Sequence, residues 1–536
     1  MNFFEPLLET PETKDEIKFA FKLTAETKNK LIFLAVCFGL VFLIYGSTLF
    51  GDFVFDDRHI VEEQARLADL SSLDKTLASP YWNKETGAYR PITLASYTFN
   101  FLLFGSAPAG FHFVNLLLYA LTGFLIYRLA DKLFKEKILA YLSGIIFLIL
   151  PIHTEVAANI VGRAEILALL FSLLALIELV KDRKDQAGVK KYKKYWPAGF
   201  WFFLAIGSKE TAIAVLPIAV FIVYFNESIG GRNFWRKENL YKYWPAWLWL
   251  AAGAIAYFAF RLMVLGQRYF LSSEASLVEN PLLFTDAGSR LITAFAILWL
   301  YLKKSFWPFN LCSDYSFNQI PVLHAFSASA ILGLSFFLLI IAGVFLFFRR
   351  APILSLGSAF FLFGFLPAAN IIFPTGTIMG ERLMYYPSVG LSFYLAYGLY
   401  AIYNFQKRKI FKYSAIGLFA ALAVFYGLMG YWRAGDWLTE KRLFASAAEC
   451  APASVLSRSN LGAVYYLDGN LAAAKQELLA AQAIYGGYAK GVNNLGLIYR
   501  REGDGAKARG LFLKALALPF PYYGAWENLA LISLEE

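Results

Sequence analysis

The sequence is poor in charge and in cysteine, and it lacks the common nucleotide-binding motifs. Only 17% of its 536 residues are charged, while 58% are hydrophobic. A water-soluble chain of this length needs far more polar surface to cover its core. Neither a phosphate-binding G-x-x-x-x-G-K-S/T loop nor a dinucleotide fingerprint occurs in the chain. These absences argue against an ordinary soluble enzyme and against a nucleotide-dependent one.

The few cysteines and the positive net charge are equally informative. Cys37, Cys312 and Cys450 lie far apart, so their spacing forms no metal motif and defines no disulfide framework. The net charge of +11 comes from basic residues in short blocks between apolar runs. That distribution follows the positive-inside rule of membrane proteins. We therefore expect a lipid bilayer around the chain, and no nucleic acid as a partner.

Long apolar runs are what the sequence has in abundance. Runs of about 20 residues recur, which is the length that crosses a hydrocarbon core. In lipid such runs must be helices, because each backbone N–H and C=O needs an internal partner. We predict an all-α, polytopic membrane bundle of about 11 spanning helices. The predicted spans are 31–50, 110–130, 138–155, 163–181, 195–208, 210–226, 243–265, 325–348, 352–372, 387–404 and 413–431.

The basic blocks orient these spans. Placing all of them in the cytoplasm puts residues 1–30 inside and the loop 51–109 outside. Within that loop, the aromatic segment 91–105 is too short to span and suits an interfacial helix. The blocks are 128–137, 181–194, 232–242, 349–350 and 407–412.

Segment 290–309 is apolar but contains Lys303 and Lys304. A crossing there would place the basic blocks 349–350 and 407–412 on the outer side, against the positive-inside rule. We therefore predict a re-entrant or surface-lying helix on the outer side, which puts the C-terminal domain outside. If the segment crosses, there are twelve spans and that domain is cytoplasmic.

After the membrane domain, 31–431, the sequence becomes polar and repetitive. The segment 461–465 (Leu-Gly-Ala-Val-Tyr) recurs as 495–499 (Leu-Gly-Leu-Ile-Tyr), an offset of 495 − 461 = 34 residues. This is the helix–turn–helix spacing of tetratricopeptide (TPR) repeats, so we assign a TPR domain to 432–536. Such a domain is either a plain packing module or a concave surface for a peptide or another subunit.

Ionisable residues gather at the predicted outer ends of the spans. Asp56 and Asp57 follow the first span, with His59 close by. Two adjacent carboxylates there can supply a general base or bind a metal, whereas a solvated helix cap is the structural alternative. His153 and Glu155 lie in the second outer loop and can join Asp56 in a metal site. We favour a hydrogen-bond network that positions one base.

Basic residues occur at the same ends. Arginine forks and lysine ammonium groups are the usual partners of a phosphate. Together with acids on the outer face of a bundle, they indicate chemistry on a lipid-phosphate substrate. The basic residues are Arg90, Arg163, Lys209 and Arg382, and acids adjoining them include Glu165, Glu210 and Glu381.

The order of these motifs resembles a known family. It runs from the acidic pair through Tyr-Arg-Pro (89–91), His-Thr-Glu (153–155), Gly-Arg-Ala-Glu (162–165) and Ser-Lys-Glu (208–210) to Glu-Arg-Leu-Met-Tyr-Tyr-Pro-Ser (381–388). The chain is similar to the TPR-containing transmembrane O-mannosyltransferases of the GT-C glycosyltransferase superfamily. The resemblance implies inverting transfer of a sugar, typically mannose, from a polyprenyl- or dolichyl-phosphate donor on the extracytoplasmic side. It implies no cofactor and no metal.

The resemblance also suggests roles for individual residues. Related enzymes begin their catalytic motif with Asp-Glu and a His two residues beyond, and the segment 55–59 (Phe-Asp-Asp-Arg-His) matches it, with Asp57 replacing the Glu. Asp56 is then the general base, and Asp57 or Glu155 positions the acceptor or the sugar. Arg90, Arg163, Lys209 and Arg382 are the candidate ligands of the donor phosphate. The remaining candidates, for substrate positioning, are His59, His153, Glu165, Glu210 and Glu381.

Other functions stay open at this point. The acceptor hydroxyl belongs to protein Ser or Thr, or to a glycan or lipid as in O-antigen-modifying transferases. The chain can also be a transporter or flippase, or a membrane scaffold with a TPR docking domain. Transporters place charges at mid-bilayer, whereas the charges here cluster at the outer ends. The expected location is the plasma membrane of a bacterium or archaeon, or the endoplasmic reticulum membrane of a eukaryote.

Overall fold

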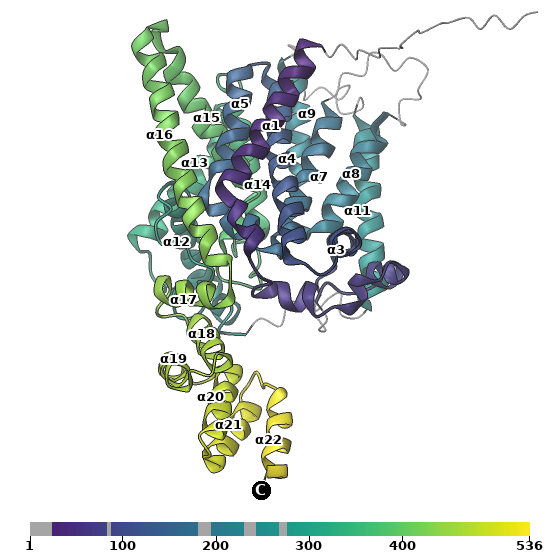
Figure 1. Ribbon diagram of the computed structural model, residues 1–536. Coiled ribbons are helices and arrows are strands. Elements are labelled where there is room, and N and C mark those ends of the chain that lie inside the picture. Colours follow the sequence, from purple (N-terminus) through teal and green to yellow (C-terminus); the bar gives the residue numbers. More distant parts are fainter. Residues whose placement is uncertain (1–23, 83–86, 181–193, 230–242, 267–275, 536) are drawn as a thin grey trace, which may run out of the picture.

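The computed structural model describes residues 24–82, 87–180, 194–229, 243–266 and 276–535, and every regular element in these ranges is helical. The long helices run side by side in one bundle, and the C-terminal helices project from one end of it (Figure 1). The predicted all-α class is confirmed. The bundle helices are α1 (Ala25–Tyr45), α4 (Pro108–Phe134), α5 (Lys137–Ile149), α7 (Arg163–Leu179), α8 (Trp196–Ser208), α9 (Val215–Ile229), α11 (Trp244–Leu265), α13 (Ala328–Leu346), α14 (Pro352–Phe365), α15 (Ser388–Asn404) and α16 (Lys409–Ala434).

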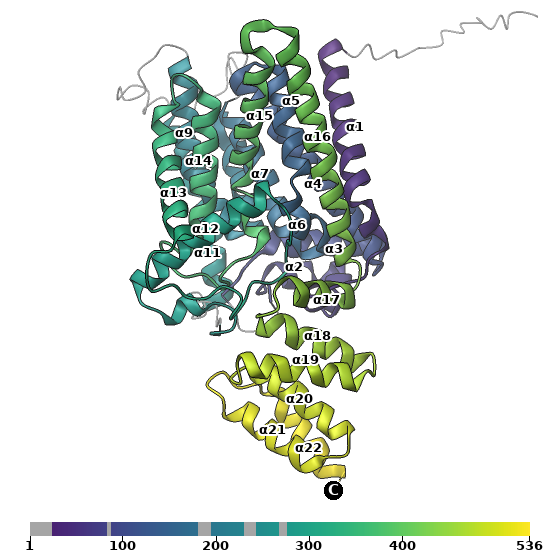
Figure 2. The same cartoon turned by 90° about the vertical axis from the view of Figure 1, so that its left-hand side faces the viewer.

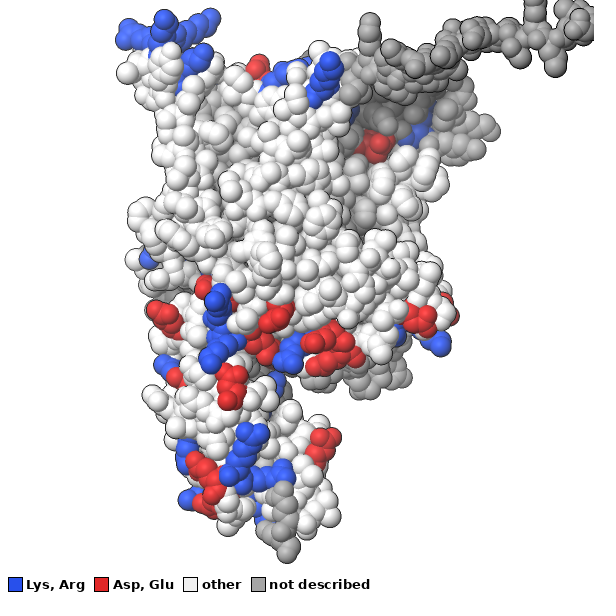
Figure 3. All heavy atoms as spheres, in the orientation of Figure 1, with Lys and Arg blue, Asp and Glu red and all other residues white. Residues whose placement is uncertain are grey.

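The bundle has the dimensions and surface of a multi-pass membrane protein. Among the described residues, six helical stretches are long and apolar enough to cross a bilayer. α5 and the helical turn Pro151–Ala158, bent by 53°, form either a broken seventh span or a re-entrant loop. α8, α9, α14 and α15 are shorter than the six stretches, so the count of eleven spans stays a prediction. On the face seen in Figure 3, a broad uncharged band lies between two charged ends of the bundle. The six stretches are Ala25–Phe50, Pro108–Phe134, Ile160–Leu179, Trp244–Leu265, Ala328–Leu346 and Lys409–Trp437.

The two ends differ in charge. At the end opposite the C-terminal helices, Lys and Arg side chains dominate, whereas acidic and basic side chains mix at the other end (Figure 3). This asymmetry is typical of a cytoplasmic end and an outer end. Residues 1–23 and most of the predicted basic blocks 181–194 and 232–242 lie outside the described residues.

α12 (Ala287–Phe306) is the segment predicted to lie on the outer surface. It runs obliquely to the long helices (Figure 2). The loop after it returns to its beginning, where Leu323 N donates to Thr293 Oγ1 at 2.9 Å. α13 thus starts beside the N-terminal half of α12, as a re-entrant excursion requires.

The C-terminal helices repeat at the spacing found in the sequence. α20 begins 489 − 455 = 34 residues after α18, and α21 begins 505 − 471 = 34 residues after α19. Gly469 and Gly503 end the first helix of each pair with φ of 80° and 83°, a conformation that glycine adopts without strain. These helices are α17 (Glu440–Cys450), α18 (Val455–Leu467), α19 (Leu471–Ile484), α20 (Ala489–Arg501), α21 (Gly505–Ala517) and α22 (Gly524–Glu535).

A disulfide bond and a hydrogen-bonded loop fix the C-terminal helices to the bundle. Cys312, in the loop after α12, pairs with Cys450 at the end of α17, with Cα atoms 5.8 Å apart. The sequence spacing showed no such framework. Close by, Asp314 accepts hydrogen bonds from the hydroxyls of Ser454 and Ser457. Disulfides persist in oxidising compartments, so this bond is consistent with the prediction that places this end of the bundle outside.

Candidate active site

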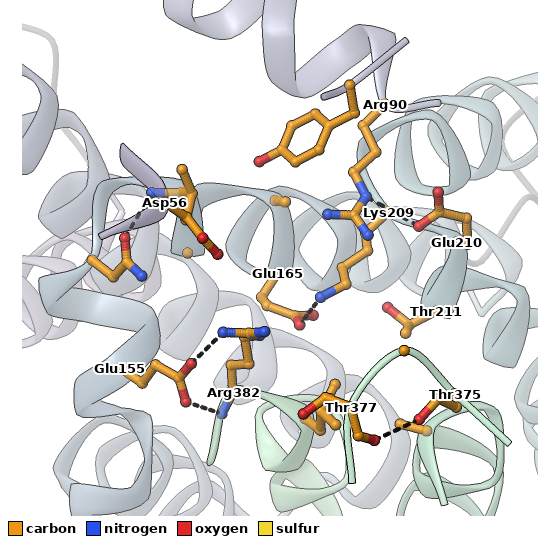
Figure 4. Close-up of a pocket in the computed structure, with 18 of the residues that line it drawn as sticks. Asp56, Arg90, Glu155, Glu165, Lys209, Glu210, Thr211, Thr375, Thr377 and Arg382 are labelled. Atoms are coloured by element: carbon orange, nitrogen blue, oxygen red, sulfur yellow. Dashed lines mark hydrogen bonds and ion pairs between the residues drawn. The ribbon is translucent and has the colours of Figure 1, made fainter. Parts of the chain in front are cut away.

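A cavity of about 850 Å³ opens at this end of the bundle. Its walls come from the first outer loop, the turn between α5 and α7, the turn between α8 and α9, and the loop 366–383 before α15. Figure 4 shows charged side chains from all four segments pointing into one space. The cavity gathers these predicted site residues: Asp56, Arg90, Glu155, Glu165, Lys209, Glu210 and Arg382.

Each cation of the cavity is held by a carboxylate. Arg382 binds Glu155 twice, through Nη1 to Oε1 at 2.6 Å and through its backbone N to Oε2 at 2.9 Å. Arg90 Nε lies 3.1 Å from Glu210 Oε2, and its guanidinium stacks 4.7 Å above the ring centre of Tyr81. These contacts fix the positive groups in place before any ligand binds.

Lys209 and Glu165 form the third ion pair of the cavity. Both side chains are almost fully buried. Burial lowers the pKa of Lys209, and the Glu165 carboxylate opposes that effect. The pair lies between the other two, so the three cations face the same space (Figure 4).

Among the described residues, Asp56 has no such cation partner, and Glu279, which also lines the cavity, instead accepts the backbone N–H of Ser276. Within the described ranges, no hydrogen bond or ion pair reaches the Asp56 side chain, although it lines the cavity. Burial raises the pKa of Asp56, and the Arg382 guanidinium partly offsets that shift. An unpaired carboxylate with a raised pKa has the properties of a general base.

Asp57 lies in different surroundings. Its buried carboxylate accepts backbone N–H groups from Val161 at 2.8 Å, Ile160 at 3.3 Å and Val54 at 3.4 Å. Burial raises the pKa of Asp57 to about 8. The side chain is not among the residues that line the cavity. Asp57, predicted as a catalytic candidate, instead ties the first outer loop to the turn before α7.

Arg163, predicted to bind the donor phosphate, is buried beneath the cavity rather than facing it. Its Nε donates to Asn115 at 2.6 Å, and its Nη2 donates to Asn100 and to the Phe111 carbonyl, both at 2.8 Å. The guanidinium also stacks 4.8 Å above the Tyr97 ring. Arg163 is therefore positioned to hold the floor of the site together.

The two histidines of the predicted set do not meet in the cavity. The buried His153 ring hydrogen-bonds with Tyr119 through Nδ1 at 2.9 Å and with Ser388 through Nε2 at 2.6 Å. His59 is exposed, and its Nδ1 lies 2.8 Å from Glu63 Oε2. The metal alternative joined His153 to Asp56 and Glu155, and the described residues contain no group of three or more ligands suited to a metal.

Glu381 lies behind the cavity, next to Arg382 in the chain. Its Oε1 accepts the backbone N–H of Cys312 at 2.6 Å and the Tyr315 hydroxyl at 2.5 Å. Burial raises the pKa of Glu381 to about 7. Glu381 therefore connects the disulfide loop to the cavity and does not line it.

Gly162 explains how the turn before α7 presents two acids to the same cavity. A Cβ atom at this position would lie 2.3 Å from the carbonyl oxygen of Val156. Only glycine permits so close a backbone approach. The tight turn places Glu155 and Glu165, ten positions apart, on one wall.

The cavity also contains residues that sequence reasoning missed. They carry hydroxyl groups, aromatic rings and one further carboxylate, and they lie in loops with no recognisable motif. The only feature that they share in the sequence is that they lie near the predicted outer ends of the membrane spans. They include Tyr81, Trp82, Thr211, Glu279, Thr375 and Thr377.

Comparisons with known proteins find similarity to mannosyltransferases. Residues 91–260 match a family described as dolichyl-phosphate-mannose-protein mannosyltransferase. A protein O-mannosyl-transferase of Caenorhabditis elegans is 29% identical over 442 residues, covering 80% of this chain and 59% of the relative. The protein O-mannosyl-transferases TMTC4 of Homo sapiens and Mus musculus are 28% and 26% identical, covering 62% and 64% of the relatives.

The match takes in most of this chain but less of each relative. Between 79% and 81% of the chain aligns with these three proteins. The chain spans less than two thirds of their own length. The predicted resemblance is confirmed: over about four fifths of its length the chain is similar to known protein O-mannosyl-transferases.

Proposed function

We propose that the protein transfers a mannosyl residue from a lipid-phosphate donor to the hydroxyl of a protein Ser or Thr, with inversion at the anomeric carbon. The observation that carries the proposal is the unpaired Asp56 carboxylate, which faces a cavity containing three fixed cations. The names of the relatives support mannose and a protein acceptor. The reaction takes place on the outer face of the plasma membrane or in the lumen of the endoplasmic reticulum.

Asp56 acts as the base in this reaction. Its carboxylate takes the proton of the acceptor hydroxyl while that oxygen attacks C1 of the sugar from the face opposite the phosphate. The new C1–O bond forms as the bond between C1 and the phosphate oxygen breaks. The bonding electrons leave with the lipid phosphate, and the proton stays on Asp56. Such positioned proton transfer contributes roughly 10²–10⁴-fold in rate.

Arg90, Lys209 and Arg382 stabilise the departing phosphate. Negative charge on the leaving oxygen grows as the bond breaks, so cations aimed there favour the transition state over the ground state. Their ion pairs with Glu210, Glu165 and Glu155 keep them in place, which lowers reorganisation during the step.

The position of the charges favours a transferase over a transporter. The cations of the ion pairs lie at helix ends or in the loops between helices, not midway along the helices. A bilayer-embedded donor reaches such a site with its phosphate at the interface and its chain along the apolar helices.

The test uses purified protein in detergent with polyprenyl-phosphate mannose, its glucose analogue and a pool of Ser/Thr peptides. Wild type transfers or hydrolyses the mannose donor, and Asp56→Asn loses turnover while it still binds donor. Asp52→Asn is the matched control, because Asp52 is exposed and lies in the same loop. Wild-type activity in Asp56→Asn would remove Asp56 as the base. No turnover and no binding of any lipid-phosphate sugar would overturn the proposal.

A further inference from the structure

A second cavity, of about 290 Å³, lies between the first outer loop and the C-terminal helices. On the bundle side, His59 and the segment 276–278 line it. The turn between α19 and α20 and the turn between α21 and α22 close it from the other side. Neither the fold nor the proposed reaction explains this space.

The two cavities share their walls. Asp56 and Ile60 line the active-site cavity, while His59, between them in the chain, lines the second one. Likewise Glu279 lines the first cavity, and residues 276–278 line the second. A molecule that occupies the second cavity is thus separated from Asp56 by the width of one chain segment.

Ring contacts and backbone hydrogen bonds join the bundle to the C-terminal helices around this cavity. The Phe317 ring packs edge-on against Tyr485, with ring centres 5.5 Å apart. Phe284 contacts Phe520 in the same way at 5.9 Å. Two backbone hydrogen bonds, Val455 N to Phe317 O at 2.8 Å and Asn318 N to Ala453 O at 2.9 Å, join the loop to the start of α18.

The lining is mainly aromatic and aliphatic. The turns of the repeats supply Tyr485, Tyr488, Phe520 and Tyr522, and the bundle supplies Leu277 and Val278. Burying apolar surface against such walls is favourable at about 25 cal/mol per Å². The polar side chains at the edge of the cavity are those of His59, Ser276 and Lys490. The volume suits one large side chain with its adjoining backbone.

We infer that this cavity binds an aromatic or large aliphatic side chain of the acceptor polypeptide, close in sequence to the Ser or Thr that reaches Asp56. The inference rests on the proposed function and adds a specificity subsite to it. The C-terminal repeats then select the acceptor, while the bundle binds the donor. Acceptor polypeptides with such a residue near the hydroxyl are preferred over polypeptides without one.

The experiment measures transfer to two peptide series at saturating donor. In one series a Tyr or Leu is moved through the positions flanking a single Thr, and in the other the same positions are Ala. Wild type, Phe520→Ala and Leu277→Ala are compared with Tyr523→Ala, which changes a 72% exposed aromatic residue outside the cavity. We expect the KM for the best Tyr or Leu peptide to rise about tenfold in the two cavity variants, which corresponds to about 1.4 kcal/mol.

The remaining readouts separate this inference from the proposed function. Donor hydrolysis and the KM for the Ala peptide should stay unchanged in Phe520→Ala, Leu277→Ala and Tyr523→Ala. If wild type turns over donor but treats both peptide series alike, the subsite is overturned and the transferase stands. If no donor is turned over, fluorescence anisotropy of labelled Tyr and Ala peptides tests the cavity alone. Equal affinity of wild type and Phe520→Ala for the Tyr peptide would overturn the subsite. A preference of the enzyme for glycan or lipid acceptors over all peptides would also overturn it.

Discussion

Asp56 and Asp57 are neighbours in the chain, yet their carboxylates lie in opposite directions. Phe55 adopts the left-handed conformation, with φ of 55°, directly before them. This conformation is uncommon for a non-glycine residue and is maintained by surrounding contacts, here an edge-on ring contact between Phe55 and Phe444. The turn points Asp56 into the cavity and lets Asp57 bind three backbone amides.

Changing Asp57 should therefore affect stability rather than turnover. Asp57→Ala leaves the buried N–H groups of Val54 and Ile160 without this acceptor, while Val161 N–H keeps Asn159 Oδ1. Each buried group left unpaired costs about 1–3 kcal/mol. We expect a clearly lower unfolding temperature in detergent, measured by intrinsic fluorescence. Asp56→Asn, with no comparable contacts, should unfold at the wild-type temperature. An unchanged unfolding temperature in Asp57→Ala would contradict the anchoring role.

The pH dependence of turnover should report on Asp56. The base must be unprotonated to act, and burial raises its pKa above the ordinary value of 3.8. The midpoint of the acid limb in the pH profile of kcat/KM should accordingly lie at a pH above that value. Arg382 lowers the pKa of Asp56, so in Arg382→Gln the acid limb should move to higher pH in addition to any loss of rate. A limb that moves to lower pH, or stays in place, would show that another group controls it.

Among the structural elements, the loop after α12 connects the C-terminal helices to the cavity wall that contains Arg382. Cys312 forms the disulfide with α17 and donates its backbone N–H to Glu381. Glu381 precedes Arg382, the partner of Glu155. The disulfide lies outside the cavity, yet through Glu381 it supports Arg382, which lines the cavity.

Removing the disulfide should weaken both the joint and the reaction. The bond closes a segment with a sequence separation of 138 residues, and such bonds typically stabilise by about 2–4 kcal/mol. Cys312→Ser combined with Cys450→Ser should unfold at a lower temperature and turn over donor more slowly. Reductant should lower the unfolding temperature of wild type to that of the double variant. Cys37→Ser, which changes the buried free cysteine of α1, is the control. Reductant should still lower the unfolding temperature of this variant. A double variant as stable and active as wild type would contradict this role.

Elements with a local signal were predictable from the sequence, and long-range partners were not. The interfacial segment 91–105 is α3 (Pro91–Phe104), and the 34-residue offset reappears in the helix starts, because both depend on local periodicity. Arg90 and Arg163 look alike in sequence, but only the packing around Asn100 and Asn115 shows that Arg163 is buried. Cys312 and Cys450 gave no signal, because the chain between them must fold before they meet.

Similar reasoning applies to the site. Asp56, Lys209 and Arg382 follow apolar runs on the same predicted side, so their convergence could be expected from topology alone. Thr375 and Thr377 reach the cavity through a loop whose path depends on hydrogen bonds to Asn370. No pattern in the sequence encodes that path.

The two ends of the whole molecule differ in charge, and the side of the membrane that each end faces can be tested. Single cysteines at Ser533, in the exposed part of α22, and at Arg349, after α13, report on opposite ends. They are introduced with Cys37→Ala and with the disulfide intact. With the protein in a plasma membrane, a membrane-impermeant maleimide added to intact cells should label Ser533→Cys at once and Arg349→Cys only after permeabilisation. The reverse pattern would place the cavity in the cytoplasm.

The ion pairs of the active site also bear on how the reaction ends. Among the described residues, the cavity contains five carboxylates, of Asp56, Glu155, Glu165, Glu210 and Glu279, against three cations. The sugar-bearing lipid phosphate is a diester with one negative charge, whereas the phosphate left behind is a monoester with a second pKa near about 6 and hence a charge of about −1.5 to −2 at neutral pH. In the proposed reaction Asp56 keeps the acceptor proton, so four ionised carboxylates and three cations then face the spent lipid. We propose that the remaining excess of negative charge opposes the monoester more than the diester and favours release of the product.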